Sequence, residues 1–185
     1  EPLRAMLARR IIHDLGQAEL YIPGVRDSQL LVAFCAYWWQ SFTKGYAFEM
    51  EVLRDLADAN IRFVAHDLRY RDERLSPYDL IILGRQGDIK TSTYFLSVHR
   101  SEGLSHDFYI TRLYHLLTHD WRKVVLLKES FWRILNGEPT ATTVEQAWQV
   151  LPGVALVWLN RRPFVIVPYE TWKDRIRQRQ EGEPR

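Results

Sequence analysis

Residues 76–92, SPYDLIILGRQGDIKTS, decide the fold that the sequence predicts. The apolar run at residues 79–83 is typical of a buried strand, and residues 84–87 have the composition of a tight turn. Residues 88–96 then form the return strand. The segment therefore predicts a hairpin of two antiparallel strands.

The same hairpin carries an unusual pair of polar patterns. Of the five lysines, only Lys90 has an acidic residue, Asp88, two positions before it. Of the eight prolines, only Pro77 has an aspartate, Asp79, two positions after it. Two rare patterns that fall in order within fourteen residues indicate a functional site more readily than an accident.

Strand geometry places these side chains. Because side chains alternate along a strand, Asp88 and Lys90 point to one face and Ile89 points to the other. A tight turn at residues 84–87 would set Asp88 opposite Leu83. In that register, a bulge or a bend is needed to bring Asp79 and Asp88 to one point.

A helix predicted at residues 46–59 supplies a third acidic group. At 100° per residue, Glu49 shares its face with Val52, Leu53 and Leu56, so its carboxylate points inward. An inward carboxylate is costly unless a cation or hydrogen bonds satisfy it. A metal ion bound by the two hairpin aspartates would do so.

Other segments extend this pattern into a mixed α/β fold. Hydrophobic periodicity predicts an N-terminal helix at residues 3–15 and a buried helix at residues 29–41, which is apolar nearly all round. It also predicts a strand at residues 61–66, a helix at residues 105–119 and a buried strand at residues 124–127. That helix would be a crossover returning the chain to the sheet.

The last third of the chain is expected to be an extension of this core. Residues 154–159 and 164–167 are typical of a second hairpin, and residues 172–180 of a polar terminal helix that frays. We therefore expect a single domain of 185 residues. Its parts are an N-terminal helical layer at residues 1–45, a core at 46–128 and a C-terminal extension at 129–185.

Composition limits the classes of function. The formal net charge is only +2, so attraction to nucleic acid is not demanded of the whole molecule and any basic surface must be local. The single cysteine, Cys35, excludes a disulfide within the chain and is expected to be buried. We find neither an apolar run of the ~20 residues that a membrane helix needs nor a signal segment, and expect a soluble cytoplasmic protein.

The acidic residues and the lysine resemble the active site of the PD-(D/E)xK, or restriction-endonuclease-like, superfamily. That family combines a helix glutamate, a strand aspartate and an acidic-x-Lys motif on a core ordered αβββαβ. The matching positions here are Glu49, Asp79, Asp88 and Lys90, and the element order matches over residues 46–128. The chain departs from the family in one place, because Tyr78 separates the proline from the aspartate.

The resemblance implies a nuclease that depends on Mg²⁺ or Mn²⁺ and hydrolyses phosphodiester bonds, with DNA favoured by analogy. Asp79, Asp88, Glu49 and the carbonyl of Ile89 would hold the metal, since these ions prefer oxygen ligands. Lys90 would orient the nucleophile or stabilise the developing charge.

Three arginines of the preceding loop, Arg69, Arg71 and Arg74, could grip phosphates. A solvated loop, whose charge Asp72 and Glu73 partly cancel, explains them equally well. Two other functions also stay open: a catalytically silent nuclease-fold binding module, and an unrelated α/β interaction domain with Glu49 paired to an arginine. The sequence leaves open whether DNA or RNA is bound and whether the chain forms a homodimer.

Overall fold

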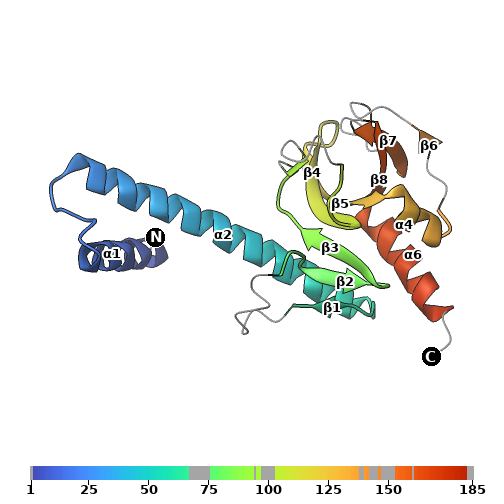
Figure 1. The fold of residues 1–185 in the computed structure, drawn as a ribbon, viewed down its shortest axis with the longest axis horizontal. Helices are drawn as coiled ribbons and strands as arrows, with labels where there is room; N and C mark the ends of the chain where they lie inside the picture. The colour runs from blue at the N-terminus through green and yellow to red at the C-terminus, as the bar shows by residue number, and fades with distance from the viewer. Residues whose placement is uncertain are drawn as a thin grey trace. The chain divides into compact units, whose positions relative to one another are not determined.

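The computed structural model describes residues 2–66, 76–93, 95–96, 103–137, 140–141, 146, 153–159 and 161–182. The three predicted arginines of the phosphate-binding loop, Arg69, Arg71 and Arg74, lie outside these residues. Two compact units are distinguished, Glu1–Ala47 and Phe48–Arg185. Helix α2 (Arg26–Asp58) belongs to both units (Figure 1).

The first unit contains helix α1 (Pro2–Gln17) and the first part of α2. The helix predicted at residues 29–41 and the one at 46–59 are a single continuous helix, because an isolated glycine such as Gly45 costs only about 1 kcal/mol and does not end a helix. No helix in the part of the chain described here is long and apolar enough to cross a membrane.

The expected burial of residues 29–41 is wrong. Large apolar side chains of this segment are exposed, and Trp38 and Trp39 retain 47% and 57% of their accessible surface. Cys35 is half-buried. Besides α2 the first unit contains one other helix, α1, and one helix has too little surface to cover another that is apolar nearly all round. This explains the difference. The other exposed large apolar residues of this segment are Leu30, Phe34 and Tyr37, and Phe42 directly after it is also exposed.

The second unit is built on one mixed sheet of eight strands, in the spatial order β1-β2-β3-β4-β5-β8-β7-β6. The strands are β1 (Val64–Ala65), β2 (Leu80–Ile82), β3 (Arg85–Ile89), β4 (Phe108–His115), β5 (Asp120–Lys128), β6 (Thr140–Ala141), β7 (Ala155–Leu159) and β8 (Arg162–Pro168). Two further helices are α4 (Glu129–Ile134) and α6 (Tyr169–Glu181). The protein is thus an α/β protein with a mixed sheet, as the sequence predicts.

Strand directions show where the chain crosses over. β3 and β4 are parallel, and so are β6 and β7, whereas the other neighbouring strands are antiparallel. A parallel pair cannot be joined by a tight turn. The chain therefore leaves the sheet after Ile89 and returns to it at Phe108. The sequence places the crossover later, between a strand at residues 88–96 and one at 124–127, and that placement is wrong because β4 and β5 are antiparallel neighbours.

The helix predicted at residues 105–119 is wrong, because residues 108–115 are strand β4 and residues 116–119 are the turn into β5. Tyr109 and Leu113 are buried, and so are Phe108 and Ile110 beside them. A strand covered on both faces shows no polar alternation, so its apolar residues can also fit a helical spacing.

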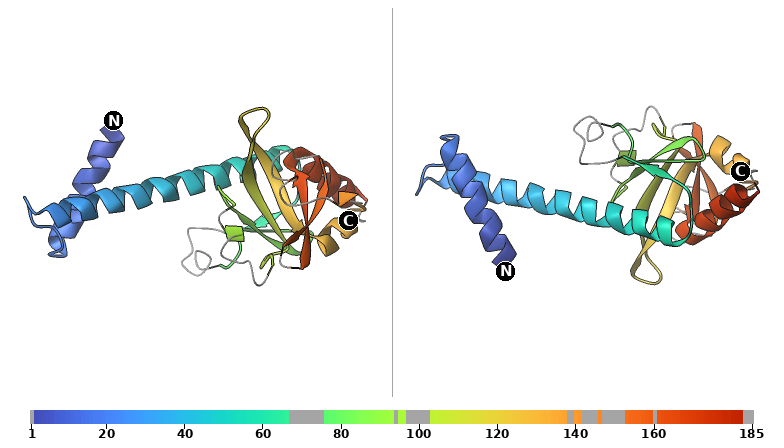
Figure 2. Two further views of the ribbon diagram at one scale, coloured as in Figure 1. Left: turned by 90° about the horizontal axis from the view of Figure 1, so that it is seen from above. Right: turned by 90° about the horizontal axis from the view of Figure 1, so that it is seen from below.

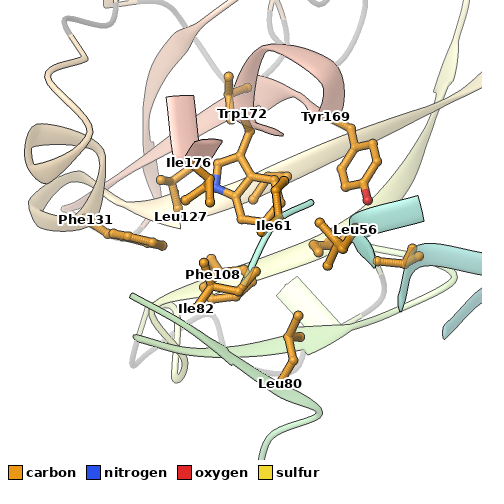
Figure 3. Packing of buried hydrophobic residues seen from close by; sticks show 14 of the residues in the cluster. Leu56, Ile61, Leu80, Ile82, Phe108, Leu127, Phe131, Tyr169, Trp172 and Ile176 are labelled. Carbon is orange, nitrogen blue, oxygen red and sulfur yellow. The ribbon is translucent and has the colours of Figure 1, made fainter. Parts of the chain in front are cut away.

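The main core lies between the sheet and three helical segments. Leu56 from the last turns of α2, Phe131 from α4 and Trp172 from α6 pack around Phe108 in the middle of the sheet (Figure 3). A second apolar cluster, which includes Tyr109, comes mainly from β4, β5, β7 and β8. Figure 2 shows the same sheet from two further directions.

The C-terminal hairpin and helix are confirmed, but the helix does not fray. Trp172 and Ile176 are fully buried, and the side-chain amide of Gln180 pairs with the backbone of Arg62. Gln180 Oε1 accepts from Arg62 N at 2.8 Å, and Gln180 Nε2 donates to Arg62 O at 2.7 Å. These contacts fix α6 beside the segment that leads into β1.

Candidate metal centre

The register of the β2–β3 hairpin brings the two predicted aspartates together. Leu80 pairs with Gly87 and Ile82 pairs with Arg85, so the next pair outward is Asp79 and Asp88. The turn consists of two residues, Leu83 and Gly84, both with positive φ, as a type I′ turn requires. The predicted turn at residues 84–87, with Asp88 opposite Leu83, is therefore wrong, and no bulge is needed.

Backbone and side-chain contacts hold the two aspartates close to each other. The backbone N–H of Ile89 donates to Asp79 Oδ2 at 2.6 Å and to Asp88 Oδ1 at 3.1 Å. Burial, together with the hydrogen-bonded and charged Asp88, raises the pKa of Asp79 to about 7. A bound cation would relieve the repulsion between two carboxylates crowded in this way and stabilise their ionised forms.

Lys90 supplies one positive charge to this cluster. Its ammonium lies 2.6 Å from each carboxylate oxygen of Asp88, whose side chain is 8% exposed. The backbone N–H of Lys90 donates to Ile110 O at 2.9 Å and so continues the parallel pairing with β4. Ile89, between them, is buried in the main core, which confirms the predicted alternation.

Glu49 reaches the cluster from helix α2. Val52 and Leu56 on the same helix face are fully buried, and the Glu49 side chain is 13% exposed, so it points inward as predicted. Burial first, and then the charge of Asp79, raise the pKa of the Glu49 carboxyl group. Glu51, two residues further along the helix, pairs instead with Arg112 at 2.7 Å.

His66 is a member of the cluster that the sequence does not single out. It directly follows β1, and its backbone N–H donates to Asp79 O at 3.3 Å. Its ring Nε2 lies 3.9 Å from Glu49 Oε1, and its Nδ1 lies 2.7 Å from Tyr78 O. One ligand atom from each of Glu49, His66 and Asp79 lies within 4.8 Å of the other two. A lone histidine at the end of a short strand has no spacing pattern that could have revealed it.

A second histidine forms an edge of the site. His106 Nε2 donates to Pro77 O at 2.6 Å, which leaves His106 Nδ1 to accept from the Tyr109 hydroxyl at 2.8 Å. Burial lowers the pKa of His106. The hydrogen bond to Pro77 O and the charge of Asp79 oppose this shift, and the charge of Lys90 adds to it. These contacts brace the segment that leads into Asp79.

The structure thus gathers ligand atoms of Glu49, His66 and Asp79 at one point. Asp88 and Lys90 lie beside Asp79, and both carboxylate oxygens of Asp88 contact Lys90, so Asp88 is not part of that group. Carboxylate oxygens and an imidazole nitrogen are suitable ligands for a divalent metal ion, so the residues fit such an ion. Ile89 contributes its backbone N–H to the site, and the role of its carbonyl as a ligand stays a prediction.

Comparisons with known proteins do not assign the chain to a family. No family model, no curated protein and no solved structure matches the chain.

Proposed function

We propose that this protein is a metal-dependent nuclease that hydrolyses phosphodiester bonds, with DNA as the favoured substrate. One observation carries the proposal: Asp79 and Asp88 face each other across a hairpin, with Glu49 from a helix and Lys90 beside them. The PD-(D/E)xK resemblance requires these residue types, with the glutamate on a helix and the other three residues on neighbouring strands.

The order of elements supports a restriction-endonuclease-like core. The end of α2 is followed by the antiparallel strands β1, β2 and β3 and then by the parallel strand β4. This order agrees with a helix, three strands and a crossover that returns the chain to the sheet. The crossover falls at residues 90–107 in this proposal, in place of the helix expected at 105–119.

The acidic residues of the chain would hold a Mg²⁺ or Mn²⁺ ion. Asp79 is the central ligand, because a proton or a cation must relieve the repulsion between it and Asp88. Asp88 becomes a further ligand where the ion competes with Lys90 for its carboxylate. Glu49 contributes a third oxygen from the helix side. When bound, such an ion lowers the pKa of a water molecule and neutralises charge on the phosphate.

Lys90 supplies the remaining charge. Its side chain is 44% exposed, so its ammonium can reach a phosphate at the surface while it stays near Asp88. There it can donate to a phosphate oxygen or orient the attacking water. An ammonium placed before the substrate arrives costs no reorganisation during the reaction.

The contacts of Glu49 weigh against an unrelated interaction domain. That alternative requires an arginine to satisfy this carboxylate. Within the described part of the chain the His66 ring lies 3.9 Å from Glu49, and Arg112 pairs with Glu51 instead. The silent binding module is disfavoured because all four expected side chains are present and close together.

Cleavage assays test the proposal. Supercoiled plasmid and labelled RNA are incubated with the protein in Mn²⁺, in Mg²⁺ and in EDTA, beside the variants Asp79→Ala and Lys90→Ala. Asp174→Ala, an exposed aspartate on α6, serves as the matched control. We expect metal-dependent cleavage of the plasmid by the wild type and the control only. Cleavage that persists in both site variants would refute the assignment.

A further inference from the structure

His66 lies where a metal ligand would lie, although the motif that suggests a nuclease does not include it. Its side chain is 10% exposed, and that of Glu49 is 13% exposed. Each comes from a different element, since His66 follows β1 and Glu49 belongs to α2. Their ligand atoms and that of Asp79 lie within 4.8 Å of one another.

The Tyr78 carbonyl fixes the tautomer of the His66 ring. A carbonyl oxygen can only accept, so the ring nitrogen 2.7 Å away, Nδ1, must carry the hydrogen. In the neutral ring Nε2 then has a free lone pair, and this is the atom that faces Glu49. A backbone carbonyl that holds one ring nitrogen while the other binds metal is the usual support of a metal-bound histidine.

The distance between His66 and Glu49 also suits an ion better than a direct contact. Nε2 and Oε1 are 3.9 Å apart, which is too long for a hydrogen bond. Two ligands bound at about 2.0–2.2 Å to one ion lie roughly 3 Å apart. A small approach of the two side chains would therefore place an ion between them.

We propose that Nε2 of His66 is a metal ligand, together with Glu49 and Asp79, and that it makes the site prefer Mn²⁺ to Mg²⁺. Imidazole suits transition metals, whereas Mg²⁺ prefers oxygen ligands and water. The inference refines the metal site of the proposed nuclease, but metal binding can be measured without any substrate.

Binding measurements on the full chain test this preference. Mn²⁺ or Mg²⁺ is titrated by calorimetry into EDTA-treated and dialysed wild type, His66→Ala, His66→Asn and His119→Ala, the last being an exposed histidine in the β4–β5 turn. We expect both His66 variants to bind Mn²⁺ at least about 10-fold more weakly, with the Mg²⁺ affinity within about twofold. Equal loss for both ions, or no loss for Mn²⁺, would overturn the inference.

A spectroscopic measurement on the wild type does not depend on whether the variants fold. Electron spin echo modulation from ¹⁴N of a directly bound imidazole should appear in the spectrum of the Mn²⁺ protein and be absent in His66→Ala. If the wild type shows no nitrogen modulation, His66 is not a ligand.

The two proposals can fail separately. Nitrogen modulation without cleavage of any nucleic acid would keep this metal site and reject the nuclease. Metal-dependent cleavage that is lost in Asp79→Ala, without nitrogen modulation, would keep the nuclease and reject His66.

Discussion

Asp79 and Asp88 are cross-strand neighbours at the open end of a two-residue hairpin, and one backbone N–H, that of Ile89, donates to both carboxylates. The hairpin thus holds two carboxyl groups close together, and burial and the neighbouring Asp88 raise the pKa of Asp79. Because the strands are paired up to this position, the alignment is a property of the sheet and not of a loose loop.

Removal of the Lys90 ammonium should separate catalysis from metal binding. Lys90 lies 2.6 Å from Asp88, so Lys90→Ala frees this carboxylate and should leave Mn²⁺ affinity unchanged or higher. Cleavage should fall by about 10²–10³-fold, as for loss of one charge-stabilising donor. Calorimetry and plasmid cleavage measure the two effects, and Lys128→Ala, which removes the partner of Asp107, is the control. Weaker Mn²⁺ binding in Lys90→Ala would contradict this role.

The raised pKa of Asp79 predicts how stability depends on pH in EDTA. The pKa is about 7 in the folded protein against an ordinary value of 3.8, so between these values the folded state holds a proton that the unfolded chain releases. The contribution of Asp79 to stability is complete below pH about 4 and is lost as the pH rises through about 7.

Asp79→Asn should remove this part of the pH dependence, because an amide does not ionise. We expect the variant to gain stability relative to the wild type as the pH rises from about 4 to 8, measured by urea unfolding in EDTA. Asp174→Asn on the surface of α6 is the control for the lost charge. Parallel pH profiles for wild type and Asp79→Asn would show that folding does not raise the pKa of Asp79.

The Phe108 ring, from β4, packs so closely against Gly87 of β3 that no larger residue fits at position 87. A Cβ added at Gly87 would lie 2.1 Å from Phe108 Cζ, and Phe108 is fully buried. Gly87→Ala should therefore lower the free energy of unfolding by about 1–3 kcal/mol or more. Gly84→Asn is the matched control, since nothing lies near that position and asparagine tolerates its positive φ of 70°. Equal, small effects in chemical denaturation would argue against the packing described.

Two tryptophans should differ sharply in their contribution to stability. Trp172 is fully buried in the main core, whereas Trp39 is 57% exposed. Trp172→Ala should lower the free energy of unfolding of the second unit by about 3–5 kcal/mol, and Trp39→Ala should change it by less than about 0.5 kcal/mol. Denaturation followed by circular dichroism measures both. A large loss of stability in Trp39→Ala would show that the α2 face is covered.

The sequence predicts an antiparallel hairpin here, but it places the return strand at residues 88–96, whereas β3 is Arg85–Ile89. It misplaces the turn because Leu83, which adopts a positive φ, is not a residue that favours one. His66 is missed since its role depends on the β1–β2 pairing, which is a long-range contact.

Both the type of an element and its burial are hard to predict for segments that are largely apolar. Tyr109 and Leu113 fit a helical spacing, but the sheet covers β4 on both faces and so removes the alternation that identifies a strand. The residues around Trp38 have the composition of a core helix, yet they are exposed, because burial depends on which surfaces are available and not on composition alone.

The two outermost strands of the sheet, β1 and β6, contain two residues each. Backbone N–H and C=O groups at a sheet edge are the usual template for adding a strand from another chain, and very short edges offer little of it. Residues 63 and 66 on either side of β1 are described and are not part of a strand, so this edge offers little main chain to another copy. A second molecule that associates there would meet mainly side chains.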